Sequence, residues 1–359
     1  MHEALAVARP GAEPAVAVPG AEPGVGVPLL ELRDASKRFV KRLDLAGKAA
    51  RLLGANLKEE VVHAVDHVSL AIRPREVVGL VGESGCGKST LGRLAVGLHT
   101  LTSGSRLWKG TDVAGAPRVA RSARLAIQMI FQDPYASLNP RMRVIDIIGE
   151  APVAHGLIPK SGQADYVADL MARVGLDASL ARRFPHQFSG GQRARIGIAR
   201  ALAVKPEFLV CDEAVAALDV SIQAQVLNLF IRLRDELDLT YLFISHDLGV
   251  VRHLSDRVVI MYLGRVVESA PAEALFEAPN HPYSKALLAE APTLEVRKKT
   301  FVAIKGEIPS PLNPPSGCHF HPRCPYSHQV PGNRCSRESP PLLQIAPQRY
   351  SACHLNDPR

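Results

Sequence analysis

Long apolar runs are absent from this chain of 359 residues. A helix that spans a lipid bilayer needs about 20 consecutive apolar residues, whereas the apolar runs here are short, such as Phe208 to Cys211 and Tyr241 to Ile244. The N-terminal region also lacks the basic start and the continuous apolar core of a secretion signal. We therefore expect a protein that does not cross a membrane by itself.

Dense runs of lysine and arginine are absent as well, and no basic motif with interleaved aromatic residues occurs. The net charge of +8 would permit contact with nucleic acid or with an anionic membrane. Without a concentrated basic motif, we expect no nucleic-acid partner and interpret the charge as a mildly basic surface. The same balance suits a protein that rests on the cytoplasmic leaflet of a membrane.

A nine-residue repeat dominates the start of the chain. PGAEPAVAV, from Pro10 to Val18, is followed at once by PGAEPGVGV, from Pro19 to Val27. A composition so rich in Pro, Gly, Ala and Val favours disorder over packed structure. We predict that residues 1–28 form a disordered tail.

The stretch VGESGCGKST, from Val81 to Thr90, has the spacing of a P-loop. Glycines in such a loop let backbone N–H groups surround phosphate oxygens at the positive start of a helix. The lysine reaches the β- and γ-phosphates, and the following hydroxyl binds Mg²⁺. Kinases, GTPases, helicases and transport motors all share this loop, so the motif alone indicates a nucleotide and no particular reaction. The candidate nucleotide-binding residues are Gly82, Glu83, Ser84, Gly85, Cys86, Gly87, Lys88, Ser89 and Thr90.

Three short apolar runs end abruptly in polar residues: Val77 to Val81, Phe208 to Cys211, and Tyr241 to Ile244. Continuous apolar runs of this length are typical of strands that are buried on both faces of a parallel sheet. Ligands of such sheets bind beyond the carboxyl ends of the strands. The sequence therefore predicts an α/β fold in which three separate segments meet at one phosphate site.

The polar residues after these runs predict a hydrolytic site. Asp212 has the position of a Walker B carboxylate that holds Mg²⁺. Glu213 is the candidate general base, because it is offset by one residue toward the attacking water. His246 is expected to contact the γ-phosphate and to help position that water.

A second helix start occurs within HQFSGGQRARIGIARAL. Ser189 is a predicted N-cap, and an apolar pattern with helical spacing follows Gly190 and Gly191. This start is a second candidate anion-binding site, although Ser-Gly-Gly before a helix also fits simple capping.

With these motifs together, the sequence resembles an ATP-binding cassette (ABC) ATPase over about residues 29–270. The resemblance implies a P-loop NTPase fold with an antiparallel β subdomain and a helical subdomain at about residues 133–203. It also implies a dimer with two ATP molecules, each bound between the P-loop of one subunit and the signature residues of the other. Those signature residues are Ser189, Gly190, Gly191 and Gln192.

Further site residues follow from the resemblance one position at a time. Phe39 matches the aromatic residue that stacks on adenine, and Gln132 matches the Q-loop glutamine that binds Mg²⁺ and water. Asp219 belongs to a matching D-loop, and His246 matches the switch histidine. The predicted catalytic residues are Lys88, Gln132, Glu213 and His246, and the predicted Mg²⁺ ligands are Ser89, Gln132 and Asp212.

The pattern of apolar residues also indicates the β subdomain. Apolar residues alternate at Leu30 and Leu32 and again at Val68, Leu70 and Ile72, which predicts strands with one buried face. The stretch between them, residues 41–61, reads as a polar and basic insertion.

Longer stretches resemble the oligopeptide/dipeptide importer branch of the ABC ATPases. They include MIFQDPYASLNPR (Met129 to Arg141), HPYSKALL (His281 to Leu288) and GEIPSPLNPPSGCHFHPRC (Gly306 to Cys324). YASLNPR resembles the F-type subunit of such importers. The resemblance implies that this ATPase drives the uptake of di- or oligopeptides from the cytoplasmic face of the inner membrane. The implied partners are a D-type ATPase in a heterodimer, two transmembrane permease subunits and an extracytoplasmic peptide-binding protein.

Two alternatives remain at this point. Close relatives import nickel and other small solutes, so the cargo is open. ABC ATPases of DNA repair share the P-loop and signature but separate them by long coiled coils, whereas Gly82 and Ser189 are 107 positions apart here without sustained heptads.

Six cysteines occur, and four of them lie in the last 42 positions. Cys86 and Cys211 are expected to be plain small residues of the fold. The remaining four are separated by five, ten and seventeen residues, a spacing that leaves zinc, an iron–sulfur cluster and free thiols open. A disulfide is not expected in a cytosolic ATPase. The resemblance favours a [4Fe–4S] cluster in an extension over residues 271–359, with the ligands Cys318, Cys324, Cys335 and Cys353.

Overall fold

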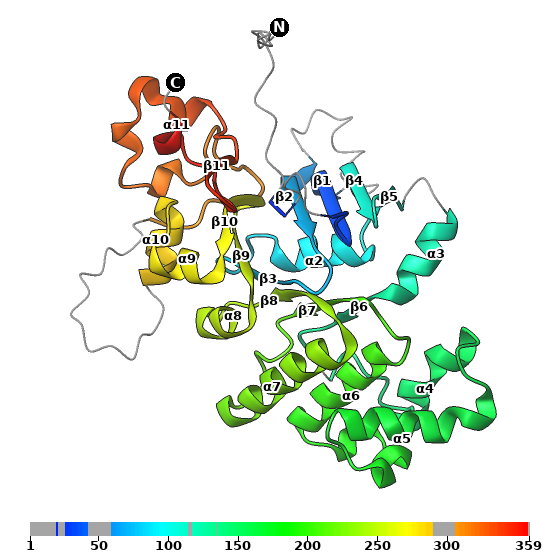
Figure 1. The fold of residues 1–359 in the computed structure, drawn as a ribbon. Coiled ribbons are helices and arrows are strands. Elements are labelled where there is room, and N and C mark those ends of the chain that lie inside the picture. Colours follow the sequence, from blue (N-terminus) through cyan, green and yellow to red (C-terminus); the bar gives the residue numbers. More distant parts are fainter. Residues whose placement is uncertain are drawn as a thin grey trace, which may run out of the picture.

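The structure is a computed structural model that describes residues 19–20, 26–41, 59–113, 117–133, 135–289 and 306–357. Most of the predicted N-terminal tail and most of the predicted insertion at 41–61 therefore lie outside the described residues. Figure 1 shows a central sheet with a second sheet on one side and a group of helices on the other. The C-terminal residues form a further part next to one end of the central sheet (Figure 1).

The central sheet has eight strands in the order β11-β12-β10-β9-β3-β8-β7-β6. From β6 to β9 the neighbours pair in parallel, and β10, β12 and β11 continue the sheet in antiparallel pairs. The strands are β3 (Val77–Val81), β6 (Ile127–Ile130), β7 (Phe208–Asp212), β8 (Thr240–Ile244), β9 (Arg257–Tyr262), β10 (Arg265–Pro271), β11 (Leu343–Ala346) and β12 (Arg349–Ser351). The three predicted strands and their parallel arrangement are confirmed.

Alternate residues of the central strands pack on opposite faces of the sheet. In β7, Phe208 and Val210 pack into one hydrophobic cluster, while Leu209 and Cys211 pack into another. The first cluster also contains buried side chains of the antiparallel sheet and of α2 (Lys88–Val96). The second contains buried side chains of α6 (Gly190–Leu202) and α7 (Val220–Leu237). Every residue of β3, β7 and β8 is buried, because both faces are covered.

The second sheet is antiparallel, with the order β2-β1-β4-β5. Its strands are β1 (Leu30–Lys41), β2 (Glu60–Ile72), β4 (Ser103–Trp108) and β5 (Thr111–Asp112). Leu30 pairs with Ile72 and Leu32 pairs with Leu70, and all four are buried. The alternating pattern in the sequence therefore predicted these strands of the β subdomain correctly.

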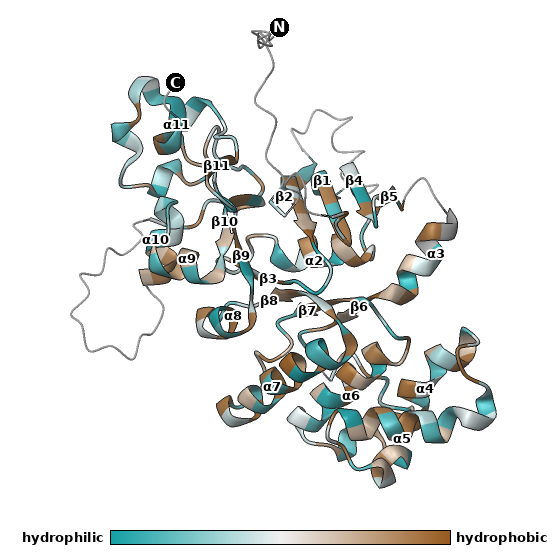
Figure 2. Ribbon diagram, viewed as in Figure 1, coloured by the Kyte–Doolittle hydropathy of each residue, from teal (hydrophilic) through white to brown (hydrophobic). Residues whose placement is uncertain are grey.

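Helices occupy most of the segment between β6 and β7, where the helical subdomain was predicted. They are α4 (Val144–Ala154), α5 (Gln163–Arg173) and α6, with 3-10 helices at Lys160–Gly162, Ala178–Arg182 and Pro185–Gln187. Figure 2 shows both hydrophobic and hydrophilic bands on these helices. The apolar bands supply Ile148, Val167, Met171 and Ile196 to the hydrophobic cluster on this side of the sheet. Among the described residues before β9, the other helices are α3 (Pro117–Ala126) and α8 (Leu248–Leu254).

The C-terminal part, predicted as an extension over residues 271–359, continues the central sheet. Ser269 of β10 pairs with Tyr350 of β12, which joins the end of the chain to the sheet. The helical elements of this part are α9 (Ala272–Glu277), α10 (Pro282–Ala289), α11 (Arg334–Arg337) and 3-10 helices at His321–Arg323, Ser327–Gln329, Pro331–Asn333 and His354–Asn356.

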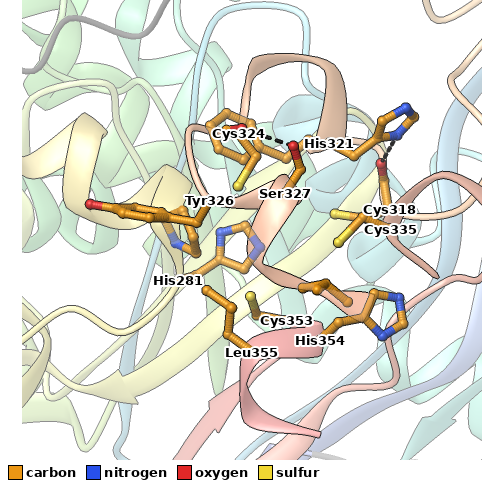
Figure 3. Close-up of a pocket in the computed structure, with 13 residues that line it drawn as sticks. His281, Cys318, His321, Cys324, Tyr326, Ser327, Cys335, Cys353, His354 and Leu355 are labelled. Carbon is orange, nitrogen blue, oxygen red and sulfur yellow. Dashed lines mark hydrogen bonds between the residues drawn. The ribbon is translucent and has the colours of Figure 1, made fainter. Parts of the chain in front are cut away.

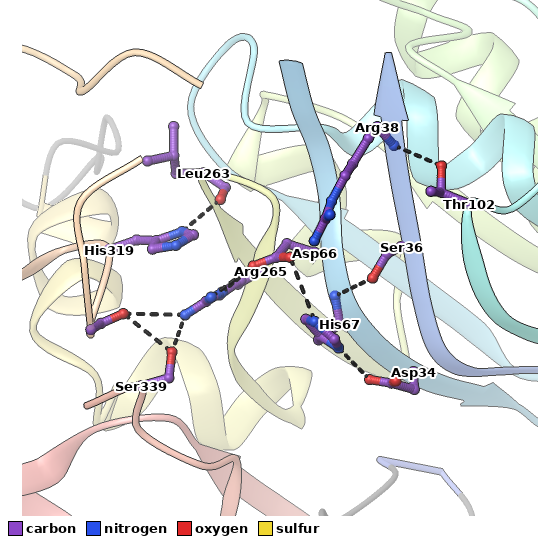
Figure 4. A network of polar contacts seen from close by, with 11 residues as sticks. Asp34, Ser36, Arg38, Asp66, His67, Thr102, Leu263, Arg265, His319 and Ser339 are labelled. Carbon is purple, nitrogen blue, oxygen red and sulfur yellow. Dashed lines mark hydrogen bonds and ion pairs between the residues drawn. The ribbon is translucent and has the colours of Figure 1, made fainter. Parts of the chain in front are cut away.

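A polar network ties the antiparallel sheet to the C-terminal part (Figure 4). Arg265 Nε donates to Asp66 Oδ2 of β2 at 2.7 Å, and Arg265 Nη1 donates to the Gly317 carbonyl at 3.2 Å. Arg265 also bonds the Ser339 hydroxyl. One guanidinium therefore joins three segments that are far apart in the sequence.

Within the part of the chain that the structure describes, no helix combines the length and the apolar character needed to cross a membrane.

Candidate nucleotide site

The P-loop connects the end of β3 to the start of α2. Gly82 and Gly87 have φ angles of 153° and 106°, in the region that favours glycine. A Cβ on either residue would lie 2.1 Å from a backbone oxygen, that of Met261 or that of Ala64. No side chain caps the start of α2. The backbone N–H groups of its first turn are therefore suited to an anion.

A cleft of about 390 Å³ lies at this loop. Besides P-loop residues, the cleft is lined by Phe39 of β1, Gln132 after β6 and Glu213 after β7. Gly82, Glu83 and Cys86 belong to the loop but are not among the lining residues. The cleft is lined by Phe39, Val62, Ala64, Ser84, Gly85, Gly87, Lys88, Ser89, Thr90, Gln132, Glu213 and Pro311.

The Lys88 ammonium is held inside the loop. Its Nζ donates to the carbonyl oxygens of Gly82 at 2.8 Å and Glu83 at 3.0 Å, and Cys86 Sγ lies 3.9 Å away. Lys88 is 5% exposed, so a positive charge is fixed at the floor of the cleft. Such a charge attracts the phosphates of a nucleotide.

Asp212 and Ser89 form a pair beside this charge. Ser89 Oγ donates to Asp212 Oδ1 at 2.8 Å, and Asp212 is buried. Burial raises the pKa of Asp212, which the hydrogen bond from Ser89 and the charge of Arg93 partly offset. A buried carboxylate next to a hydroxyl, close to a phosphate site, is a ligand set that suits Mg²⁺.

Glu213 is the centre of a second group. Its backbone is left-handed (φ 49°), and its N–H donates to the Ile244 carbonyl at 3.0 Å. Gln132 Nε2 donates to Glu213 Oε2 at 2.7 Å, and His246 Nδ1 lies 3.5 Å from the same oxygen. Asp212 lies opposite Ile244 in the β7–β8 pairing, which places the residues after both strands at one edge of the sheet. The structure thus brings three of the four predicted catalytic residues together, with Lys88 across the cleft.

The predicted signature residues do not line this cleft. Ser189 caps α6, as predicted: its Oγ accepts from Gln192 N at 3.3 Å, and its own N–H donates to Gln192 Oε1 at 3.0 Å. A Cβ on Gly191 would lie 2.5 Å from the Ile222 side chain, so the start of α6 fits closely against α7. Asp219 is the N-cap residue of α7, without a side-chain capping bond.

Three residues that sequence reasoning did not select also contact the site. Pro311 lines the cleft, Tyr283 Oη accepts from Glu83 N at 2.9 Å, and Arg323 pairs with the Glu83 carboxylate at 2.9 Å. Tyr283 and Arg323 are 200 and 240 positions from Glu83. A sequence motif consists of residues that are close together in the chain, so it cannot predict contacts at such separations.

Two family models match the chain. The ABC transporter family matches residues 65–216, and the oligopeptide/dipeptide transporter C-terminal region matches residues 267–330. The oligopeptide transport ATP-binding protein AppF of Bacillus subtilis is 48% identical over 332 residues, which cover 91% of this chain and 97% of AppF. The chain belongs to the ABC transporter ATP-binding family. It is an ABC ATPase, as the P-loop, the Asp212-Glu213 pair and the signature at Ser189 together predicted.

Other members of the family are similarly close. OppF of Salmonella typhimurium, an oligopeptide transport ATP-binding protein, is 48% identical and covers 83% of this chain and 90% of its own length. DppF of Pseudomonas aeruginosa, a di/tripeptide transport ATP-binding protein, is 46% identical and covers 82% of this chain and 90% of its own length.

Solved structures confirm the ABC ATPase fold. CbiO1 of Clostridium perfringens, part of an ABC transporter complex, matches with a TM-score of 0.57 at 24% identity and covers 70% of this chain and 91% of its own. The dimeric ATP-binding cassette MJ0796 with bound ADP and phosphate has the same TM-score and identity, and covers 68% of this chain and 98% of its own.

The four C-terminal cysteines line one small pocket with His281, Tyr326 and neighbouring side chains (Figure 3). Burial, together with the charges of Cys335, Cys353 and Cys324, raises the pKa of the Cys318 thiol to about 12. Figure 3 shows the four sulfur atoms turned toward this common space. Among the described residues, however, no group of three or more His, Cys, Asp or Glu side chains could hold a metal ion as placed. These side chains therefore do not form a site for a single ion such as zinc, and neither the structure nor the related proteins establish the predicted [4Fe–4S] cluster.

Proposed function

We propose that this ABC ATPase hydrolyses ATP to drive the import of di- and oligopeptides through a partner permease. The observation that carries the proposal is the match to a peptide-transport ATPase over 91% of the chain, together with the match of residues 267–330 to the oligopeptide/dipeptide C-terminal region. The three relatives described above all have peptide-transport names. The comparisons therefore favour peptides over nickel, and transport over DNA repair.

The residues of the cleft take the following roles in this proposal. Phe39 stacks on adenine, and the P-loop N–H groups and Lys88 bind the phosphates. Ser89, Asp212 and Gln132 would hold Mg²⁺, which supplies neutralisation of phosphate charge when bound. Glu213 accepts the proton of the attacking water, a bond forms between that oxygen and the γ-phosphorus, and the bond to the ADP oxygen breaks. Gln132 and His246 orient Glu213 and the water, as their contacts with Glu213 Oε2 support.

Ser189, Gly190, Gly191, Gln192 and Asp219 act on the ATP of a second subunit in this proposal. Their position outside the cleft of their own chain supports such a role, because they are then available to another subunit. The second subunit is a D-type ABC ATPase in a heterodimer. A substitution of Ser189→Arg should block ATP hydrolysis by the pair while ATP still binds to the P-loop of the same chain. Ser179→Arg, at an exposed position of the helical subdomain, serves as the control.

The remaining partners are two transmembrane permease subunits and an extracytoplasmic peptide-binding protein. The protein would then work at the cytoplasmic face of the inner membrane, bound to the permease.

Uptake of labelled peptides by cells tests the function. A strain that lacks this chain is complemented with the wild type, with Glu213→Gln or with the control Glu207→Gln, and uptake of labelled dipeptides, oligopeptides and nickel is measured. We expect peptide uptake with the wild type and the control, and none with Glu213→Gln. Peptide uptake that is equal in all strains would overturn the proposed cargo, and loss of nickel uptake instead would identify a metal importer.

We also propose that the pocket of Cys318, Cys324, Cys335 and Cys353 holds a [4Fe–4S] cluster. Four thiols of one pocket are a suitable donor set, and each cysteine of such a cluster binds a different iron, so the sulfurs lie further apart than around one ion. A metal would also offset the cost of burying thiolates here. Iron, zinc and sulfide content of the full chain, purified without oxygen, is the test. Cys335→Ala should lose the iron, and Cys211→Ala, in the buried strand β7, should retain it.

A further inference from the structure

The C-terminal part contacts the P-loop directly through Arg323. This residue ends a 3-10 helix and immediately precedes Cys324. Its Nη1 donates to Glu83 Oε2 at 2.9 Å and its Nη2 donates to Glu83 Oε1 at 3.1 Å. The side chains are 7% and 19% exposed. A buried fork of this kind fixes both the position and the orientation of the carboxylate.

The backbone of Glu83 is held from the same side. Its N–H donates to Tyr283 Oη of α10 at 2.9 Å. Arg323 Nη1 also donates to Tyr262 Oη at 3.3 Å, and the rings of Tyr262 and Tyr283 lie 4.7 Å apart. Phe320 packs edge-on against Tyr262, with ring centroids 5.3 Å apart. The rings of Tyr262, Tyr283 and Phe320 therefore form one aromatic group. This group supports the Arg323 guanidinium and also the Tyr283 hydroxyl, which accepts from the Glu83 N–H.

Glu83 in turn holds the lysine that faces the phosphates. The carbonyl oxygen of Glu83 accepts from Lys88 Nζ at 3.0 Å. Arg323, Glu83 and Lys88 thus form a continuous series of polar contacts from the cysteine pocket to the cleft. A shift of Glu83 would move one of the two carbonyl oxygens that hold the ammonium.

A second contact reaches the other side of the cleft. The Pro311 carbonyl accepts from His63 N at 3.0 Å, and Pro311 lines the cleft together with Phe39 and Val62. The C-terminal part therefore borders the site both at the P-loop and near the aromatic residue Phe39.

We propose that Arg323 is a positioning residue for ATP binding, which holds the P-loop through Glu83 and makes the C-terminal part of the same chain a component of the nucleotide site. The proposal concerns the ATPase reaction and is independent of the peptide cargo and of any metal in the cysteine pocket. The competing explanation is that the ion pair only attaches the C-terminal part to the ATPase. Under that explanation, its loss lowers stability but leaves the ATP affinity of the folded protein unchanged.

The test compares Arg323→Met and Glu83→Gln with a matched control in the full chain. Arg323→Met retains the length of the side chain and removes the fork. The control, Arg334→Met, changes an arginine that precedes Cys335 in the same way but pairs with Asp357 at 2.7 Å and Glu338 at 3.2 Å. Thermal unfolding identifies the variants that are folded at the assay temperature, and binding of a fluorescent ATP analogue and steady-state ATPase kinetics are then measured.

We expect Arg323→Met and Glu83→Gln each to weaken ATP binding by about tenfold, as one lost charge-assisted hydrogen-bond pair would. KM for ATP rises accordingly, whereas kcat stays close to that of the wild type, because Glu213 and Gln132 are untouched. The double variant should be no weaker than either single variant, since both remove the same interaction. Exchange of the two charges, Arg323→Glu with Glu83→Arg, should restore part of the affinity.

Tyr283→Phe keeps the inference testable if Arg323→Met does not fold. This change removes only the hydroxyl that accepts from Glu83 N and retains the ring, and we expect a smaller rise in KM, again without a change in kcat. ATP affinity equal to that of the wild type in a folded Arg323→Met or Tyr283→Phe variant would overturn the proposal. An equal loss of affinity in Arg334→Met would also overturn it, because the effect would then not depend on the contact with Glu83.

Discussion

Replacement of Glu213 by glutamine separates ATP binding from ATP hydrolysis. The amide has the size of the carboxyl group, and its oxygen can still accept the hydrogen bond that Gln132 donates at 2.7 Å. The amide cannot accept a proton from water. Loss of a general base lowers turnover by about 10²–10⁴-fold, which corresponds to about 2.7–5.5 kcal/mol of transition-state stabilisation. ATP affinity should stay near that of the wild type, because Lys88 and the P-loop are unchanged.

Phosphate release at saturating MgATP and binding of a fluorescent ATP analogue measure the two effects. Glu207→Gln is the matched control, since Glu207 precedes the same strand β7 at its opposite end and pairs with Lys109 at 2.7 Å on the surface. The control should retain both turnover and binding. Turnover of Glu213→Gln equal to that of the wild type would refute the assignment of the base, and loss of ATP binding would show that Glu213 instead supports the loop.

Three further results are expected. Phe39→Ala should raise KM for ATP about tenfold without lowering kcat, since one aromatic–base stacking contact contributes about 1–3 kcal/mol; equal KM values would contradict the role of Phe39. Ser89→Ala should raise the Mg²⁺ concentration needed for half-maximal activity, because the hydroxyl beside Asp212 is lost; an unchanged Mg²⁺ titration would exclude Ser89 as a ligand. Asp66→Asn should lower the free energy of unfolding by about 1–3 kcal/mol at pH 7, because it weakens the bond to Arg265. Burial raises the pKa of Asp66, but the hydrogen bond and charge of Arg265 outweigh burial and lower it. The folded pKa is thus below the unfolded value, so this stabilisation is present at neutral pH and is lost as the pH falls below about 4. In urea titrations, the difference from the wild type should shrink there; a difference that grows toward acid would contradict the assignment.

The sequence predicted the strands around the site because their burial leaves a clear pattern. Every residue of β3 lies in the interior, so its five positions had to be apolar or small, and the run stood out from its neighbours. In β1 the apolar residues alternate at Leu30 and Leu32, and both pack into the hydrophobic cluster, although Glu31 between them is buried too. Ser189 was predictable for a local reason as well, since an N-cap depends on the next three residues only.

The limits of two predictions have physical causes. The sequence predicted an extension from residue 271, but it did not predict that Tyr350 pairs with Ser269 and continues the central sheet. Strand pairing between distant segments leaves little signal in either segment. The cysteine spacing allowed several metal sites, but only folding decides whether sulfur atoms converge. In the structure they line one pocket without forming the ligand set of a single ion.

The sequence by itself determined the chemistry of this protein: a phosphate-binding loop, a carboxylate pair after a buried strand and a family of ABC ATPases. These features depend on short segments, in which residue type and spacing fix the local geometry. Only the tertiary structure decided what surrounds that chemistry. It placed Gln132 and His246 in contact with Glu213. It also placed Arg323 and Tyr283, which are 240 and 200 positions away in the sequence, in contact with Glu83. Such contacts depend on how whole sheets and helices pack, which no local pattern specifies.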